Sequence, residues 1–185
     1  MGYAQALEKA WMEVSDLAKE RNFSVRLLSD SYEVDLNDKA VRSLSCNIPA
    51  KEHISIIILH YLIQKLKFEG LPATTGEWLD FNQLEGAAGY YPTFKKRTID
   101  HILRKYGSQP EALLNVAEHL PAKQAGTGDI GIIIDALENV PMLITIWKAD
   151  DEFGPDANIL FDKNITKIFC IEDTVVLTEI VAHTI

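Results

Sequence analysis

Five carboxylates stand among the sixteen residues from Trp147 to Asp162, between two apolar stretches of the chain. They are Asp150, Asp151, Glu152, Asp156 and Asp162. Clustered carboxylates can ligate a divalent cation, and they raise one another's pKa, which prepares a general acid. The competing interpretation is a turn between strands, because Gly-Pro-Asp at positions 154–156 is typical of turns and Asp162 can cap a following helix. The spacing lacks the glycine and the terminal glutamate of an EF-hand loop.

Four aromatic residues form a second candidate site, on an irregular and glycine-rich connection at positions 78–91. They are Trp78, Phe81, Tyr90 and Tyr91. Long irregular connections often carry function, and aromatic side chains there can line a pocket for a planar ligand. In the competing interpretation these side chains plug the connection into the core.

Three cations follow at Lys95, Lys96 and Arg97, in the first turn of a predicted helix. The positive end of a helix together with cationic side chains makes a candidate anion site. The competing interpretation is a solvated basic face.

Other reactive residue types are scattered. Cys46 and Cys170 are far apart without a CxxC motif, and both are predicted to be reduced structural thiols. His53 and His60 are two helical turns apart, about 10 Å, which is too far to bind one metal ion. The chain has no HExxH or GxSxG motif, and its glycine-rich segment before Ile130 leads into a strand, unlike a phosphate loop. We therefore predict no metal and no cofactor.

Changes in hydrophobic period predict the elements that position these residues. Helical spacing from Tyr3 to Lys19 puts Trp11 on a buried face, and Pro49 is expected to begin a second helix. Further helices are predicted at 93–106, at 110–120 and in the C-terminal segment, where a strand competes for the last ten residues. Alternating patterns predict strands at 23–28, 31–36, 40–45, 129–136, 142–147 and 158–162. Without regular βαβ alternation, these two groups of antiparallel strands packed with several helices indicate an α+β fold.

The composition suits one compact domain over residues 1–185, because 47% of the residues are hydrophobic and 24% are charged. A net charge of -9 works against binding to nucleic acid or to an anionic membrane. No stretch approaches the roughly 20 apolar residues of a membrane span, and the acidic N-terminus is unlike a signal peptide. We expect a soluble cytoplasmic protein.

The C-terminal part resembles the signature of an uncharacterised prokaryotic domain-of-unknown-function family of anaerobic bacteria and archaea. The matching features are Trp147, Asp151-Glu152-Phe153, Leu160-Phe161-Asp162 and Glu172-Asp173. The segments HYLIQ and GEWLDFNQL are similar to the family's middle section. The resemblance implies a compact α+β domain working beside redox or corrinoid-type anaerobic enzymes. Some members are fused to an iron–sulfur-binding segment with clustered cysteines, which this chain lacks, so cluster binding is not carried over.

Two functions from different classes follow as hypotheses. The leading one is a binding or accessory module without catalytic activity of its own, which recognises a protein partner or a small ligand through the aromatic connection and the acidic turn. The alternative is a small enzyme that uses Asp151, Glu152 and Asp162 as divalent-cation ligands or acid–base groups. A homodimer formed through one exposed face is a third arrangement.

Overall fold

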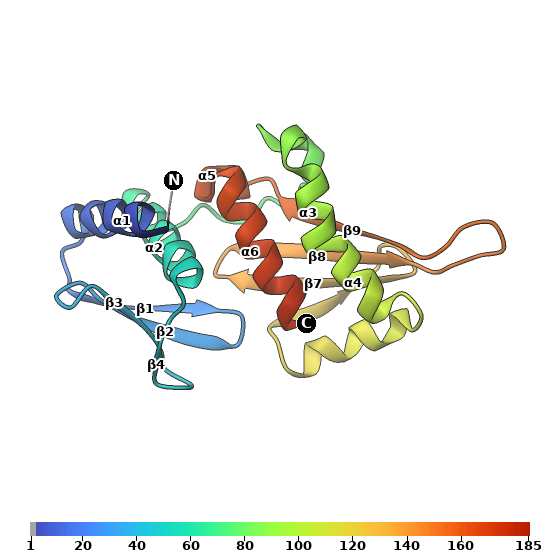
Figure 1. Ribbon diagram of the computed structural model, residues 1–185, viewed down its shortest axis with the longest axis horizontal. Coiled ribbons are helices and arrows are strands. Elements are labelled where there is room, and N and C mark those ends of the chain that lie inside the picture. Colours follow the sequence, from blue (N-terminus) through green and yellow to red (C-terminus); the bar gives the residue numbers. More distant parts are fainter. Residues whose placement is uncertain (1–2) are drawn as a thin grey trace.

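An antiparallel four-stranded sheet forms the N-terminal part of the fold, with two helices on one of its faces (Figure 1). The structure is a computed structural model that describes residues 3–185. Its first elements are α1 (Tyr3–Leu17), β1 (Asn22–Leu27), β2 (Asp30–Asp35), β3 (Ala40–Ser43), β4 (Ile48–Pro49) and α2 (Glu52–Lys67). Val34 and Val41 are buried, while Glu33 and Arg42 are exposed. The alternating patterns that predicted these strands are therefore confirmed, with one face of the sheet buried and the other solvated.

A five-stranded antiparallel sheet in the order β5-β9-β8-β7-β6 forms the second part, with α3, α4 and α6 beside one another along one face (Figure 1). Its strands are β5 (Trp78–Asp80), β6 (Ala122–Ala125), β7 (Ile130–Leu137), β8 (Val140–Trp147) and β9 (Asp156–Asp162). The helices are α3 (Tyr91–Arg97), α4 (Ile99–Tyr106), α5 (Ile165–Ile168) and α6 (Ile171–Thr184), with 3-10 turns η1 (Phe81–Gln83), η2 (Ala87–Gly89) and η3 (Pro110–Glu118).

The core joins the two sheets. One cluster of buried apolar side chains includes Trp11 of α1, Ile57 of α2 and Ile144 of β8. The backbone N–H of Leu28, in the β1–β2 turn, donates to the carbonyl of Ala136 in β7 at 2.7 Å, and α2 packs against both α5 and α6. The fold is α+β with two groups of antiparallel strands, as expected. Within residues 3–185, no helix has both the length and the apolar character needed to cross a membrane.

Two helix boundaries differ from the predicted ones. Pro49 was expected at a helix start, but it lies in β4, opposite Arg42 of β3, and α2 begins at Glu52. The single helix expected at 93–106 is broken at Thr98, whose φ of -120° and ψ of -72° are not helical. The Thr98 hydroxyl donates to the carbonyl of Phe94 at 2.8 Å, a contact that bends helices.

Two other elements differ from the predicted ones, and a third decides between the helix and the strand that were both considered for the C-terminal segment. The short strand β6 was not predicted, and the helix expected at 110–120 is the 3-10 segment η3. The last residues form helix α6, so the competing strand is wrong. Threonine is accommodated there because Thr174 and Thr178 donate their hydroxyl groups to the carbonyls one turn back.

Candidate functional site

The acidic residues after β8 form the tip of the β8–β9 hairpin, which projects beyond the rest of the sheet (Figure 1). We call residues 148–155 the hairpin tip. Asp150 organises it, because its Oδ1 accepts from the backbone N–H groups of Glu152 at 2.8 Å and Phe153 at 2.7 Å. These hydrogen bonds hold the pKa of Asp150 below its ordinary value. Asp151 and Glu152 are exposed, and Phe153 beside them is 70% exposed.

Asp162 lies at the opposite end of β9 from the hairpin tip. A strand of seven residues is about 20 Å long at 3.3 Å per residue. Asp151 and Glu152 therefore share no centre with Asp162. Within residues 3–185, no group of three or more His, Cys, Asp or Glu side chains is placed to hold a metal ion. The five carboxylates between Trp147 and Asp162 therefore lie near the two opposite ends of β9 and form no common site.

Asp162 is instead a buried anchor for the segment before β5. Asp162 is only 2% exposed. Its carboxylate accepts hydrogen bonds from the backbone N–H groups of Thr75 at 2.9 Å, Gly76 at 2.8 Å and Asn164 at 3.0 Å. The Thr75 hydroxyl also donates to it at 3.1 Å. The Asn164 side chain donates to the carbonyl of Ala73, which ties the same segment to the start of α5. A buried carboxylate with four donors is satisfied by the protein itself.

The aromatic connection is held in the core by one of its four aromatic residues. Phe81 is fully buried and stacks on Phe94 of α3, with ring centroids 3.9 Å apart and planes 10° apart. The expectation that Phe81 belongs to a ligand surface is therefore wrong, because its ring fills the core. Trp78 is half-buried in strand β5, and Tyr91 is half-buried against the core. Tyr90 remains exposed.

The start of α6 gathers polar side chains from α2 and from the residue that precedes α3. The Tyr90 hydroxyl, next to α3, donates to Glu172 at 2.5 Å, and this hydrogen bond is the main cause of a lowered pKa for Glu172. His60 of α2 contacts Asp173 at 2.8 Å, from Nδ1 to Oδ2. Cys170 immediately precedes the helix. The sequence singled out Glu172-Asp173 as part of the family signature but gave no sign of their partners, Tyr90 and His60, which come from distant parts of the chain.

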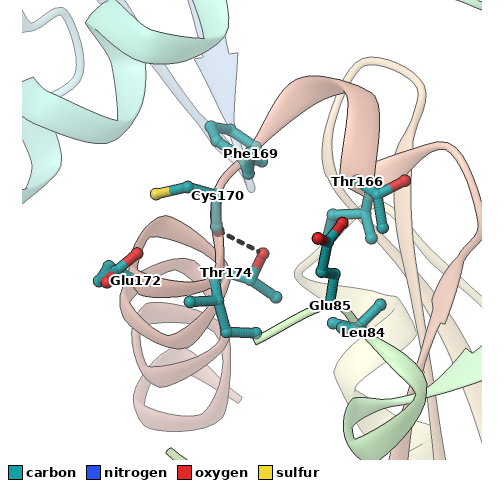
Figure 2. A pocket seen from close by; sticks show the side chains of 9 residues that line it. Leu84, Glu85, Thr166, Phe169, Cys170, Glu172 and Thr174 are labelled. Atoms are coloured by element: carbon teal, nitrogen blue, oxygen red, sulfur yellow. Dashed lines mark hydrogen bonds between the residues drawn. The ribbon is translucent and has the colours of Figure 1, made fainter. Parts of the chain in front are cut away.

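A cleft of about 300 Å³ opens beside this cluster, between the Leu84–Glu85 segment and the α5–α6 connection (Figure 2). Ile165, Phe169 and Ile171 give it an apolar lining, while Glu85 and Glu172 add carboxylates. Figure 2 shows the Cys170 sulfur directed away from Glu85 and Thr166 across the cleft. The arrangement suits a small apolar group with a cationic end, because it offers apolar surface and negative charge.

The polar groups around Cys170 are not arranged to activate its thiol as a nucleophile. In an activated pair the histidine contacts the thiol, whereas here Asp173 stands by both Cys170 and His60. The residue as a whole is exposed, yet partial burial of its thiol, with the Asp173 and Glu172 carboxylates adding to it, raises the Cys170 pKa to about 12. Both cysteines are free and exposed, so neither packs in the core as a structural thiol would.

We expect the Cys170 thiol to react slowly for this reason. In a Cys46→Ser background at pH 8, iodoacetamide should alkylate Cys170 on the order of 30-fold more slowly in the native protein than in urea, because the thiolate fraction is smaller. Mass spectrometry of timed samples measures the two rates. A native rate that equals or exceeds the rate in urea would show an activated thiol and contradict this account.

The three cations proposed as an anion site lie in the last turn of α3, not in a first turn. The break at Thr98 is the cause, because it ends the helix directly after Arg97. The positive end of that helix is therefore not beside them. Lys95 pairs with Asp100 at 2.7 Å, and Arg97 contacts Glu179 of α6 at 3.3 Å.

Comparison with known proteins gives one family. Residues 8–184 match the family described as Domain of unknown function (DUF3786), so the chain belongs to that family. This confirms the expected membership of an uncharacterised domain family. No curated protein and no solved structure matches the chain.

Proposed function

We propose that this member of the DUF3786 family is a binding module without catalytic activity of its own, and that the hairpin tip is its recognition element. The observation that carries the proposal is Phe153, a large aromatic residue left 70% exposed at the end of a projecting hairpin. An exposed aromatic ring gains free energy when an interface buries it, and aromatic residues are frequent anchors of interfaces. The function of binding a protein partner follows from that position.

The local geometry supports recognition because the tip is ordered before it binds. The backbone N–H of Asp150 donates to the carbonyl of Phe153 at 2.9 Å, in addition to the two hydrogen bonds that its carboxylate accepts. A turn fixed in this way loses little conformational entropy on association, which favours affinity.

Charge around Phe153 suggests the chemistry of the partner. Asp151 and Glu152 precede it in an exposed turn, and the chain carries a net charge of -9. An apolar pocket rimmed by lysine or arginine would complement an aromatic ring beside two carboxylates. The family resemblance supports a finer proposal, in which the partners are enzymes of anaerobic redox or corrinoid metabolism in the prokaryotic cytoplasm.

The enzymatic alternative has less geometric support. Asp151 and Glu152 are separated from Asp162 by the length of β9, and Asp162 already accepts four hydrogen bonds. We therefore propose no reaction for these carboxylates.

Replacing Phe153 by serine should remove the partner without changing the fold. Because the ring is exposed, the free energy of unfolding should change by no more than about 0.5 kcal/mol. In affinity purification from the native source, we expect the enrichment of specifically bound proteins to fall about tenfold or more, as it does when an interface loses a central aromatic anchor. Quantitative mass spectrometry measures the enrichment.

Phe68, 52% exposed at the end of α2, provides the matched control as Phe68→Ser. The control should retain the same enriched proteins as the wild type. Equal enrichment by the Phe153→Ser variant, or equal loss with the control, would contradict the proposal. Enrichment of only a second copy of this chain would show that the tip forms a homodimer.

A further inference from the structure

Two grooves on the helical side of the molecule meet along one shared wall. They have volumes of about 570 and 480 Å³, and both are lined by Arg97, Glu179 and His183. Lys96 and Arg104 add cations to the larger groove. Lys51 and His53 add further basic groups to the smaller one.

The grooves are positive in a protein that is otherwise strongly acidic. Four cations, Lys51, Lys96, Arg97 and Arg104, face one carboxylate, Glu179, which gives a local net charge of +3 when the histidines are neutral. The whole chain has a net charge of -9. The cations come from α3, α4 and the start of α2, so the tertiary fold gathers them. A charge of this sign concentrates anions in the grooves.

A pair of stacked histidines borders the same surface. The rings of His101 and His183 have centroids 4.0 Å apart and planes 21° apart. Nη2 of Arg104 lies 3.3 Å from Nδ1 of His101, and because arginine can only donate, this contact requires an unprotonated Nδ1. Partial burial, with the charges of His183, Arg104 and Lys105 adding to it, lowers the pKa of His101. A bound anion would oppose these positive charges and would therefore favour the protonated form of His101.

We propose that the two grooves form one site for a small ligand that carries two or more adjacent phosphate groups. Arg97 and Arg104 supply planar guanidinium groups that match phosphate oxygens in geometry, and Lys96 and Lys51 supply point charges on either side. A ligand with several charges is needed because the cations line both grooves. Lys95 takes no part, because it lines neither groove and pairs with Asp100 instead.

Glu179 limits the affinity of this site in the free protein. Its carboxylate contacts Arg97 at 3.3 Å and is common to both grooves. A phosphate bound at Arg97 would stand close to that like charge, which costs binding free energy. Removing the Glu179 charge should therefore strengthen phosphate binding. A basic surface that only attracts anions in general would not single out this one residue.

The test is a calorimetric titration of the whole chain with inorganic triphosphate at pH 6.5 and low salt. We expect one triphosphate per chain and weaker binding as NaCl is added. Arg104→Gln should weaken binding about tenfold or more, because it removes a charge-assisted contact. Glu179→Gln should tighten binding about threefold or more, because it removes the opposing charge.

Arg42→Gln, which removes an exposed arginine from β3, is the matched control and should bind as the wild type does. As a second readout, the NMR signal of the His101 ring should shift on addition of triphosphate in the wild type and in this control.

No binding by the wild type at millimolar triphosphate would overturn the proposal, as would unchanged binding by Arg104→Gln or equal weakening by Arg42→Gln. ATP bound more tightly than triphosphate would support the site and identify a nucleotide. A single-stranded oligonucleotide bound more tightly than either would overturn the small-ligand assignment.

The position of His101, stacked on His183 at the wall of the grooves, predicts a pH dependence that sulfate can measure, because the charge of sulfate is constant between pH 5.5 and pH 8. His101 is neutral at high pH and gains a proton as the pH falls, so sulfate should bind more tightly at pH 5.5 than at pH 8. His101→Gln should reduce that difference, and an unchanged difference would overturn the role of the pair. Arg104 and Lys105 of α4 act on His101 directly. The charged or titratable groups that line the grooves together with His183 are Arg104, Glu179 of α6, Lys96 and Arg97 of α3, and Lys51 and His53 at the start of α2.

Discussion

Replacing Asp162 by alanine is expected to lower the free energy of unfolding by about 3–5 kcal/mol, which is a large part of the stability of a typical domain. The substitution leaves the backbone N–H groups of Thr75, Gly76 and Asn164 without the acceptor that they share. A fully buried donor without a partner costs about 1–3 kcal/mol, and because Thr75 and Gly76 belong to an exposed segment, water recovers part of the cost for their two donors. Urea denaturation followed by circular dichroism and by tryptophan fluorescence measures the change.

Two further variants separate the anchoring role of Asp162 from a functional one. Asp162→Asn keeps one carbonyl acceptor, so we expect a smaller loss, about 1–2 kcal/mol. Asp151→Ala, in the exposed hairpin tip, should change the stability by no more than about 0.5 kcal/mol. An Asp162→Ala protein as stable as the wild type, or more stable, would contradict the anchoring role, because residues kept for function often destabilise the fold.

Replacing Phe81 by alanine should cost about 3–5 kcal/mol of unfolding free energy, because it empties a fully buried aromatic site. The ring stacks on Phe94 and also packs near Phe161 of β9, at 6.4 Å between centroids, so it joins the aromatic connection to both α3 and the sheet. The same urea measurement applies. Phe81→Leu refills most of the volume and should cost less than about 1.5 kcal/mol.

Tyr90→Phe is the control within the same connection. It removes only an exposed hydroxyl and its hydrogen bond to Glu172, so its effect on stability should stay below about 1 kcal/mol. If the Phe81→Ala protein instead unfolded at the same midpoint urea concentration as the wild type, Phe81 would not be a core residue. The hypothesis that its ring binds a ligand would then be favoured again.

Six strands were predictable because their signal is local, whereas β4, β5 and β6 were not predicted. Tyr32 and Val34 are buried and Glu33 between them is exposed, and that alternation is visible in the sequence itself. The break at Thr98 was not predictable in the same way, because the Thr98 hydroxyl makes the same bond to the carbonyl one turn back that Thr174 and Thr178 make in the unbroken helix α6. Helical periodicity continues across it.

The candidate site was predicted less well, because its contacts are not local. Asp162 is recognisable as an acid at a strand end, but Thr75 and Gly76, which supply most of its donors, are 87 and 86 positions away. The His101–His183 stack is likewise formed between helices that are distant in the chain. Spacing along one segment can show which carboxylates are close in sequence, whereas the length of β9 decides which ones can meet.

The claim that the hairpin tip contacts a partner is tested most directly by photo-crosslinking in the native host. The photoreactive amino acid p-benzoylphenylalanine replaces Phe153 in one strain and Phe68 in the other, and the products are identified by mass spectrometry. We expect a discrete crosslinked species at position 153, absent at position 68, and weakened when Asp151 and Glu152 are changed to Asn and Gln. No product at position 153, or the same products at both positions, would contradict the claim.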